Sequence, residues 1–210
     1  SLNTISIIAV PAYWFLGRSK FEGYVDARRD ITLDIDAERL EILNSFKSFT
    51  VKVPPDFPEY QAIKSLAKTP FMKGNNVHLL VDGKATYDSI YKGIESAKDY
   101  VLFQFYILRA DTSGNRFKKQ LIQKAAEGLD VYVLYDELGS IELKADWLQE
   151  FHQAGIQIIP FNTRQGKRNR FQVNFRNHRK IVVVDGRSAW VGGLNVGDDY
   201  LGENPKLSPW

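Results

Sequence analysis

Regular hydrophobic patterns begin near residue 76 and alternate from there between strand-like and helix-like spacing. Short apolar stretches predict strands over residues 77–81, 100–107, 130–135, 156–161, 180–184 and 188–191. Between them, apolar residues three and four positions apart predict helices over residues 87–97, 117–125 and 147–154. Strands that alternate with helices predict an α/β fold, a sandwich in which helices flank a mixed central β-sheet.

Two features refine this predicted sheet. Residues 100–107 are apolar on both faces except at Gln104, which is typical of a central strand. Asp185-Gly186 separates the last two predicted strands and indicates a β-hairpin, and Asp82-Gly83 indicates a turn after the first strand. No glycine-rich nucleotide-binding loop follows any predicted strand, and the sequence contains no internal repeat.

Residues 1–20 predict a membrane anchor that is truncated at its start. The stretch from Leu2 to Leu16 is mostly apolar, but it is shorter than the roughly 20 residues that cross a bilayer. Basic residues follow this stretch instead of preceding it, unlike those of a signal peptide, and predict that this end faces the cytoplasm. A buried soluble helix or an interfacial segment is the alternative.

Residues 21–73 predict a charged connector. Residues 37–46 and 61–68 have the spacing of short amphipathic helices, and three prolines lie between their centres. Residues 74–210 form the main predicted domain, whose last residues contain two prolines and indicate a loop rather than a finished domain edge. We therefore expect the chain to be a fragment at both ends.

The composition narrows the chemistry. The chain has no cysteine, which excludes disulfides, cysteine-bound zinc and thiol catalysis. None of its three histidines, at positions 78, 152 and 178, has a partner at metal-ligand spacing, so we expect neither a metal nor another cofactor. The net charge is only +3, yet residues 162–184 contain seven basic residues and no acidic one. This basic stretch is either a solvated loop or an anion-attracting rim beside an active site.

Candidate catalytic residues lie close to the predicted hairpin. His178 and Lys180 are two residues apart on a predicted strand, so both side chains leave the same face of the sheet. The hairpin brings residues 192–195 back to that end of the sheet. The glycines there would let the backbone approach a ligand closely, and Asn195 adds an amide donor.

This set of groups suits a phosphodiester. A neutral imidazole at His178 can attack phosphorus and form a phosphohistidine, and the nearby ammonium of Lys180 favours the neutral imidazole. Lys180 and Asn195 can stabilise charge on the phosphate oxygens. The leaving alkoxide also needs a proton donor, but His78 and His152 are better explained as structural residues. We therefore expect the acid to come from a second chain or from a continuation of this one.

The spacing His-x-Lys-x4-Asp, then six residues, then Gly-Gly-x-Asn resembles the pattern of the phospholipase D superfamily. The matching positions are His178, Lys180, Asp185, Gly192, Gly193 and Asn195. Within this superfamily the flanking residues resemble bacterial cardiolipin synthases, at residues 104–107, 111, 114, 134–140, 174–181 and 192–202. The resemblance covers residues 74–210 and implies the first half of a phospholipase D-like catalytic domain.

The resemblance also implies roles for these residues. Two such motifs would meet across a pseudo-two-fold axis, with His178 as the nucleophile and the other histidine as the general acid. The implied catalytic residues are His178, Lys180 and Asp185, and the implied phosphate ligands are Lys180, Gly193 and Asn195. The motif aspartate is mainly structural in such enzymes, and a turn-forming role also suits Asp185. The acidic residue that orients the histidine usually follows Gly-Gly-x-Asn, where the weak candidates are Asp198, Asp199 and Glu203.

The activity implied by the resemblance is phosphatidyl transfer. One phosphatidylglycerol would give its phosphatidyl group to His178 and release glycerol, and a second would accept the group to form cardiolipin. The implied partners are an anionic phospholipid, the membrane and a second motif-bearing half. The implied location is the bacterial inner membrane, with the catalytic domain on the cytoplasmic side.

Three alternatives remain open from the sequence. They are a homodimeric single-motif phosphodiesterase or nuclease, another phospholipase D-type hydrolase, and a non-catalytic scaffold or lipid-binding module. The apolar start and the lack of aromatic residues spaced for base stacking argue against nucleic acid as a partner.

Overall fold

The computed structural model describes residues 42–54, 56–67, 69–161 and 176–202. These residues form two units, one up to residue 79 and the other from residue 80 onward, and each is described by itself. The predicted membrane anchor at residues 1–20, Glu203 and most of the basic stretch lie outside the described residues. No helix among the described residues is both long and apolar enough to cross a bilayer.

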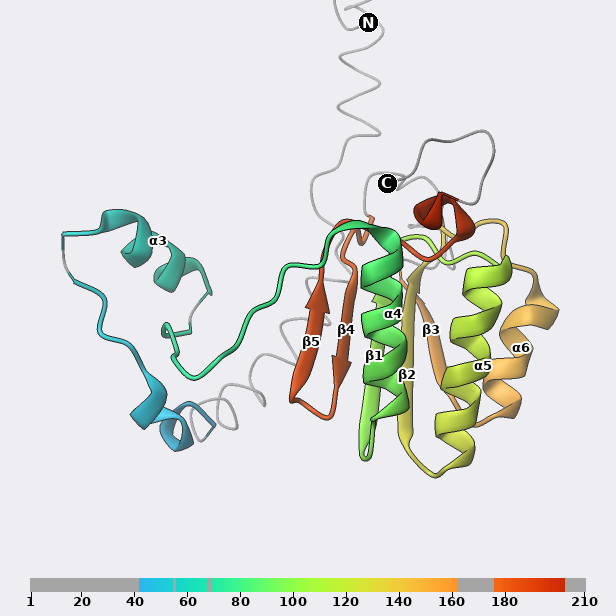
Figure 1. Cartoon of the computed structure of the whole chain (residues 1–210), viewed down its shortest axis with the longest axis horizontal. Helices are drawn as coiled ribbons and strands as arrows, with labels where there is room; N and C mark the ends of the chain where they lie inside the picture. Colours follow the sequence, from blue (N-terminus) through green and yellow to red (C-terminus); the bar gives the residue numbers. More distant parts are fainter. Residues whose placement is uncertain (1–41, 55, 68, 162–175, 203–210) are drawn as a thin grey trace, which may run out of the picture. The chain divides into compact units, whose positions relative to one another are not determined.

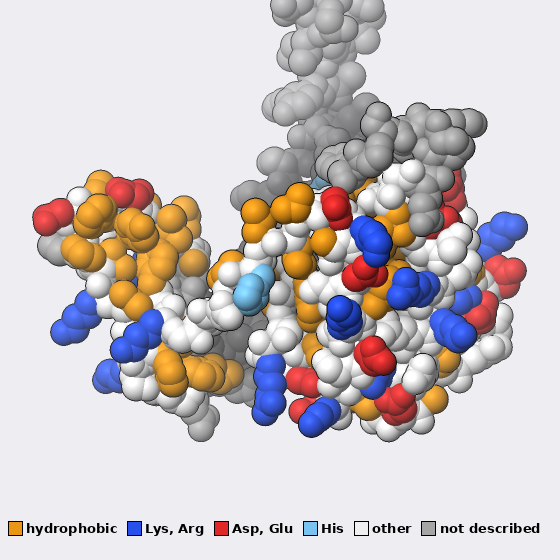
Figure 2. All heavy atoms as spheres, in the orientation of Figure 1, with side chains coloured by type: hydrophobic (Ala, Val, Ile, Leu, Met, Phe, Trp, Pro, Cys, Tyr) orange, Lys and Arg blue, Asp and Glu red, His pale blue; other side chains and the backbone are white. Residues whose placement is uncertain are grey.

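The first unit contains a 3-10 helix, η1 (Lys47–Phe49), and helix α3 (Pro58–Ala67) (Figure 1). Its chain returns on itself, because the N–H of Val51 donates to the carbonyl of Phe71 at 2.7 Å. α3 confirms the helix predicted at residues 61–68 and begins three residues earlier, at a proline. None of the described residues of this unit is buried, and hydrophobic side chains cover much of its visible surface (Figure 2).

In the second unit, five strands form one mixed sheet in the order β3-β2-β1-β4-β5 (Figure 1). Their bounds are β1 (Tyr100–Phe105), β2 (Asp130–Asp136), β3 (Gln157–Phe161), β4 (Ile181–Val184) and β5 (Ser188–Val191). β1, β2 and β3 are parallel, whereas β4 is antiparallel to both β1 and β5. The predicted mixed sheet, its central strand at residues 100–107 and the hairpin at Asp185-Gly186 are thereby confirmed.

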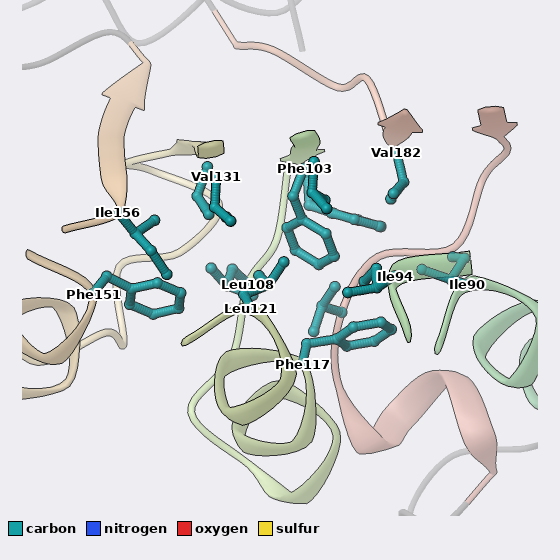
Figure 3. Packing of buried hydrophobic residues seen from close by; sticks show 14 of the residues in the cluster. Ile90, Ile94, Phe103, Leu108, Phe117, Leu121, Val131, Phe151, Ile156 and Val182 are labelled. Carbon is teal, nitrogen blue, oxygen red and sulfur yellow. The ribbon is translucent and has the colours of Figure 1, made fainter. Parts of the chain in front are cut away.

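Three helices cover one face of this sheet: α4 (Asp82–Glu95), α5 (Thr112–Ala126) and α6 (Ala145–Gln153) (Figure 1). Each turns apolar residues at helical spacing toward the strands, as predicted. Phe103 of β1 and Phe117 of α5 are buried at the centre of the core, with ring centroids 5.3 Å apart (Figure 3). The α/β class is confirmed, with the described helices on a single face. On the other face, Leu102, Tyr132 and Ile159 are exposed.

The strand predicted at residues 77–81 is wrong. Val77 and Leu79 are 87% and 88% exposed, and no described strand pairs with this segment, so its apolar pattern does not reflect burial in a sheet. The Asp82-Gly83 pair begins α4 instead of forming a turn, because the carboxylate of Asp82 accepts the N–H of Ala85 at 2.8 Å. The backbone also packs tightly here, since a Cβ on Gly83 would lie 1.8 Å from the carbonyl oxygen of Tyr200.

Candidate active site

His178 lies in the segment that leads into β4, and not within the strand as predicted. β4 pairs with β1 only as far as Ile181, opposite Gln104, because β1 ends one residue later. The exposed imidazole of His178 stacks on the ring of Tyr106, the residue directly after β1. The two ring centroids are 3.8 Å apart and the planes are inclined by 19°.

Lys180 meets the same tyrosine. Its Nζ lies 5.1 Å from the centroid of the Tyr106 ring and donates to the carbonyl oxygen of His178 at 2.6 Å. Partial burial lowers the pKa of the Lys180 ammonium below its ordinary value, because the charged form loses water. The imidazole of His178 and the ammonium of Lys180 therefore lie together at the ring of Tyr106, as expected for side chains on one side of the chain.

Tyr106 also binds a third basic side chain, since Nη1 of Arg176 donates to its hydroxyl at 3.2 Å. The sequence analysis did not single out Tyr106, which entered only as part of a stretch that resembles cardiolipin synthases. A signal for it exists in hindsight. An aromatic residue with a polar tip directly follows a buried strand, where the chain leaves the sheet and functional side chains are often placed.

Asp136, at the end of β2, also lies within a stretch that resembles cardiolipin synthases, at residues 134–140, but was not predicted as a site residue. Its side chain is buried, with 1% of the residue exposed. One carboxylate oxygen accepts the N–H of Asn177 at 2.8 Å, and the other accepts the N–H groups of Leu138 and Gly139, each at 3.0 Å. These bonds compensate for the burial of the carboxylate. They also fix the backbone of the residue that precedes His178.

The glycine pair after β5 lies beside this group. The N–H of Gly192 donates to the carbonyl oxygen of Lys180 at 3.4 Å. Gly193 is exposed, and a Cβ placed on it would have no atom of the described residues within 4 Å. Open space therefore lies next to the backbone at Gly193, as expected for a position where a ligand approaches closely.

Asn195 has a different environment from the one predicted. The side chain is buried, its Oδ1 accepts the N–H of Ile107 at 3.0 Å, and its Nδ2 donates to the hydroxyl of Tyr200 at 2.8 Å. These bonds fasten the segment after the glycine pair to the segment after β1. The described contacts therefore give Asn195 a structural role, and binding of phosphate by its amide stays a prediction.

Asp185 lies at the opposite end of β4 from Lys180. Its carboxylate accepts the N–H groups of Lys98, Asp99 and Tyr100, each at 2.9 Å. The bond from Tyr100, followed by those from the other two, holds the pKa of Asp185 below its ordinary value. Its φ of 51° is left-handed, as a tight turn requires. The structure does not bring Asp185 to His178, so the catalytic role predicted for it has no geometric support here, whereas the turn-forming role does.

The two described candidate acids that could orient the imidazole bind other groups, and the two other histidines are exposed elsewhere. Asp198 accepts the N–H groups of Thr112 and Ser113 at the start of α5, and Asp199 forms a 3.3 Å ion pair with Arg109. His78 is exposed in the segment before α4, and His152 is exposed on α6. The described contacts of Asp198 and Asp199 do not include His178. The acidic residue that would orient its imidazole is therefore not among the described contacts.

A cleft of about 650 Å³ lies near Asp198 and Asp199 but does not include His178. Of the described residues, six acidic side chains and two basic ones, Arg109 and Lys144, line it. An acidic cleft repels phosphate. The group formed by His178, Lys180 and Gly193 is therefore the better candidate for an active site.

The arrangement offers three elements for the chemistry of an anionic ester. It has an exposed imidazole that can act as a nucleophile, an ammonium on the same ring, and an open backbone position at Gly193. A second imidazole that could act as a proton donor is not found near His178 among the described residues.

Comparison with known proteins agrees with these features. Residues 90–205 match a family model described as "Cardiolipin synthase, PLD-like domain". Over its whole length the chain is 44% identical to cardiolipin synthase A of Pseudomonas putida strain W619 and 41% identical to that of Pseudomonas fluorescens strain Pf-5. It covers 44% of each of these relatives, so it spans less than half of their length.

Among solved structures, the chain is similar to NucT from Helicobacter pylori. The TM-score is 0.44 and the sequence identity 17%, over 58% of this chain and 72% of NucT. That similarity is too low to support an inference about this chain. The match to the family model is different, because it covers more than half of the chain and includes every position of the spaced motif. The chain thus belongs to the cardiolipin synthase family of proteins with a phospholipase D-like domain.

Proposed function

We propose that the chain is the first catalytic half of a phosphatidyl transferase that makes cardiolipin from two molecules of phosphatidylglycerol. The observation that supports this most directly is the placement of His178 and Lys180 against the single ring of Tyr106. The cardiolipin synthases among the relatives support the choice of substrate, although the chain covers only 44% of their length.

The reaction has two displacement steps at phosphorus. The neutral imidazole of His178 attacks the phosphorus of one phosphatidylglycerol, a P–N bond forms, and the P–O bond to the glycerol head group breaks. The departing glycerol oxygen takes a proton from a general acid. A hydroxyl of a second phosphatidylglycerol then gives its proton to the conjugate base of that general acid and attacks the phosphohistidine, the P–N bond breaks, and cardiolipin forms with a free His178.

Lys180 acts on charge in both steps. Negative charge develops on the phosphate oxygens in each transition state, and a nearby ammonium stabilises it. The backbone at Gly193 offers the closest approach to the bound phosphate, and Asn195 holds the segment that carries this glycine. Lys180, Gly193 and Asn195 therefore stabilise or shape the site of the transition state and do not protonate the leaving group. The proton donor has to come from another part of the protein or from a partner chain.

The remaining parts of the proposal concern the second half and the arrangement of the domains. A second half with its own His-x-Lys-x4-Asp motif supplies the general acid, either from a longer protein or from a partner chain. Residues 1–20 anchor the enzyme in the inner membrane, residues 21–73 connect the anchor to the catalytic domain at 74–210, and this domain faces the cytoplasm. The apolar start and the basic residues after it support this arrangement.

The first step can be tested without the second half. A phosphatidyl ester of p-nitrophenol has an acidic leaving group that needs no proton donor, so His178 alone should displace it. We expect a burst of one equivalent of nitrophenolate and a mass increase equal to one phosphatidyl group on His178, in a bond that acid cleaves. His178→Ala should show neither, and His152→Gln, which changes another exposed histidine, should retain both.

The product identifies the reaction. With phosphatidylglycerol as acceptor, the labelled enzyme should yield cardiolipin when the second half is present. If phosphatidic acid were the sole product, the enzyme would be a hydrolase and not a transferase. A burst that persists in His178→Ala would overturn the role of His178 altogether.

A further inference from the structure

Exposed apolar side chains are concentrated in one part of the chain. Among the described residues, sixteen large hydrophobic side chains are exposed, and eleven of them lie between residues 42 and 81. The described residues after position 81, which are more numerous, have only five. A soluble surface normally scatters such residues singly, so this concentration needs an explanation.

The part of this segment between residues 42 and 73 is ordered by its own backbone and not by a core. The N–H of Val51 donates to Phe71 and the N–H of Lys73 to Phe49, at 2.7 and 2.8 Å, so the chain closes on itself around α3. The aromatic rings form a short row, with centroids of Phe57 and Tyr60 5.8 Å apart and those of Tyr60 and Phe71 5.3 Å apart. None of the described residues in it is buried, so the apolar side chains have no interior of their own to enter.

Helix α3 shows the pattern most clearly. Tyr60, Ile63 and Leu66 fall on one side of the helix, and Leu66 is 85% exposed. A short helix that turns apolar residues outward gains nothing from water. It gains stability when that side enters an apolar layer.

The charges around these side chains are mostly positive. The described residues between 42 and 73 include four lysines and two acidic residues, and both acidic residues lie within four positions of each other at the start of α3. The lysines are Lys47, Lys52, Lys64 and Lys73. Figure 2 shows basic side chains beside the hydrophobic ones in this unit. Aromatic and aliphatic side chains mixed with lysine are typical of protein surfaces that lie in the headgroup layer of an anionic membrane.

We propose that residues 42–73 are an interfacial membrane-binding surface that inserts Leu66, Ile63 and neighbouring apolar side chains into the headgroup layer of an anionic bilayer. The lysines contact the lipid phosphates, while their aliphatic stems lie along the apolar surface. This contact is additional to the anchor proposed at residues 1–20. It revises the view of this region as a plain connector. It deepens the proposed function, which requires an anionic lipid as substrate, but it does not depend on any catalytic residue.

The lack of cysteine allows a direct experiment. A single Leu66→Cys change gives the whole chain one attachment site for NBD, a dye that becomes brighter and shifts to the blue when it leaves water. The matched control is Ile141→Cys in the second unit, where the native side chain is 69% exposed. On vesicles of phosphatidylcholine with phosphatidylglycerol, we expect the shift at position 66 but not at 141, and quenching at 66 by lipids brominated near the headgroup. Both labelled proteins carry the same residues 1–20, so attachment to the vesicles through that segment is common to the two.

Charge changes test the electrostatic part. Lys47→Glu and Lys64→Glu should each weaken the vesicle-dependent shift at position 66 by about five-fold in lipid concentration, and Lys92→Glu in α4 should not. Vesicles of phosphatidylcholine alone should give a smaller shift than the anionic ones.

The results that overturn the proposal are distinct. A label at position 66 that emits as in water on anionic vesicles contradicts it. A label already shielded without vesicles would show that another part of the chain covers the surface, or a second copy if the shielding rises with protein concentration. The same labelling with His178→Ala separates this proposal from the proposed function, since the shift should persist in a protein that no longer forms the phosphatidyl adduct.

Discussion

The imidazole of His178 stacks on the phenol ring of Tyr106, with ring centroids 3.8 Å apart and planes inclined by 19°. The same ring receives the ammonium of Lys180 over its face and the guanidinium of Arg176 at its hydroxyl. One residue at the end of β1 therefore holds the orientation of the proposed nucleophile and of its neighbouring cation. Its contribution separates into a ring and a hydroxyl, which two substitutions can distinguish.

We expect Tyr106→Leu to lower kcat/KM for phosphatidyl transfer by about 10²-fold, because a nucleophile that loses its platform moves out of line with phosphorus. Tyr106→Phe keeps the ring and, among the described contacts, loses the hydrogen bond from Arg176, so the fall in kcat/KM should stay within about ten-fold. Proton NMR of the chain gives a reading independent of activity. The ring protons of His178 should carry an upfield ring-current shift that Tyr106→Phe retains and Tyr106→Leu removes. Equal shifts in the two variants would contradict the stacking.

Asp136→Asn should damage both stability and activity. The amide that replaces Oδ2 would face the N–H of Asn177, donor against donor, in a buried place. The cost in the free energy of unfolding should be about 1–3 kcal/mol, measurable by urea denaturation. Displacement of Asn177 also displaces His178, so the rate of adduct formation should fall even at temperatures where the variant is fully folded. Asp130→Asn, at the exposed start of the same strand, is the matched control and should change neither quantity.

Gly193→Ala should separate activity from stability in the opposite way. Among the described residues the added methyl would meet no atom within 4 Å, so the melting temperature should stay that of the unchanged protein. The methyl occupies the open space where the phosphate is proposed to approach, so KM should rise. In Gly83→Ala the methyl would meet a backbone carbonyl, and the melting temperature should fall instead. Unchanged kinetics in Gly193→Ala would remove this glycine from the substrate site.

Asp185 should make stability depend on pH. Its pKa is lower in the folded protein than in the unfolded chain, because three backbone N–H groups bind the carboxylate. The stabilisation is therefore present above the ordinary pKa of about 4 and is lost as the pH falls through the lower folded value. Asp185→Asn tolerates the same left-handed turn but lacks the charge. The difference in melting temperature between the two proteins should be largest near pH 6 and shrink below pH 4. A difference that does not change with pH would contradict this explanation.

The parts of the fold that the sequence predicted well are those that local pattern determines. Apolar residues at helical spacing mark α4, α5 and α6 because each of these helices has one face in the core. The apolar stretch at 100–107 marks β1, whose alternate residues Val101, Phe103 and Phe105 are buried in the core. The segment at 77–81 has the same composition as a strand, but burial depends on a neighbouring strand, and sequence pattern alone does not report the neighbour.

The site divides in the same way. Spacing along the chain was enough to pair His178 with Lys180, since both belong to one short segment. Tyr106 and Asp136 escaped detection because they act from the ends of β1 and β2, and they meet that segment only through the order of strands in the sheet. Asn195 matches the motif position of a phosphate ligand, yet its side-chain amide is hydrogen-bonded to Ile107 and Tyr200 of the protein itself.

The four residues of β4 separate two parts of one motif that have different tasks. His178 and Lys180, which are proposed to carry out the chemistry, lie at one end. Asp185 lies at the other end, where its carboxylate binds the backbone at the start of β1. Evolution can therefore discard one without the other. A descendant that kept the aspartate and lost the histidine would preserve the architecture as a pseudoenzyme, so a genome search that scores the motif as a single unit would count inert copies as active ones. Scoring the two ends of the motif separately would distinguish membership of the family from the ability to catalyse the reaction.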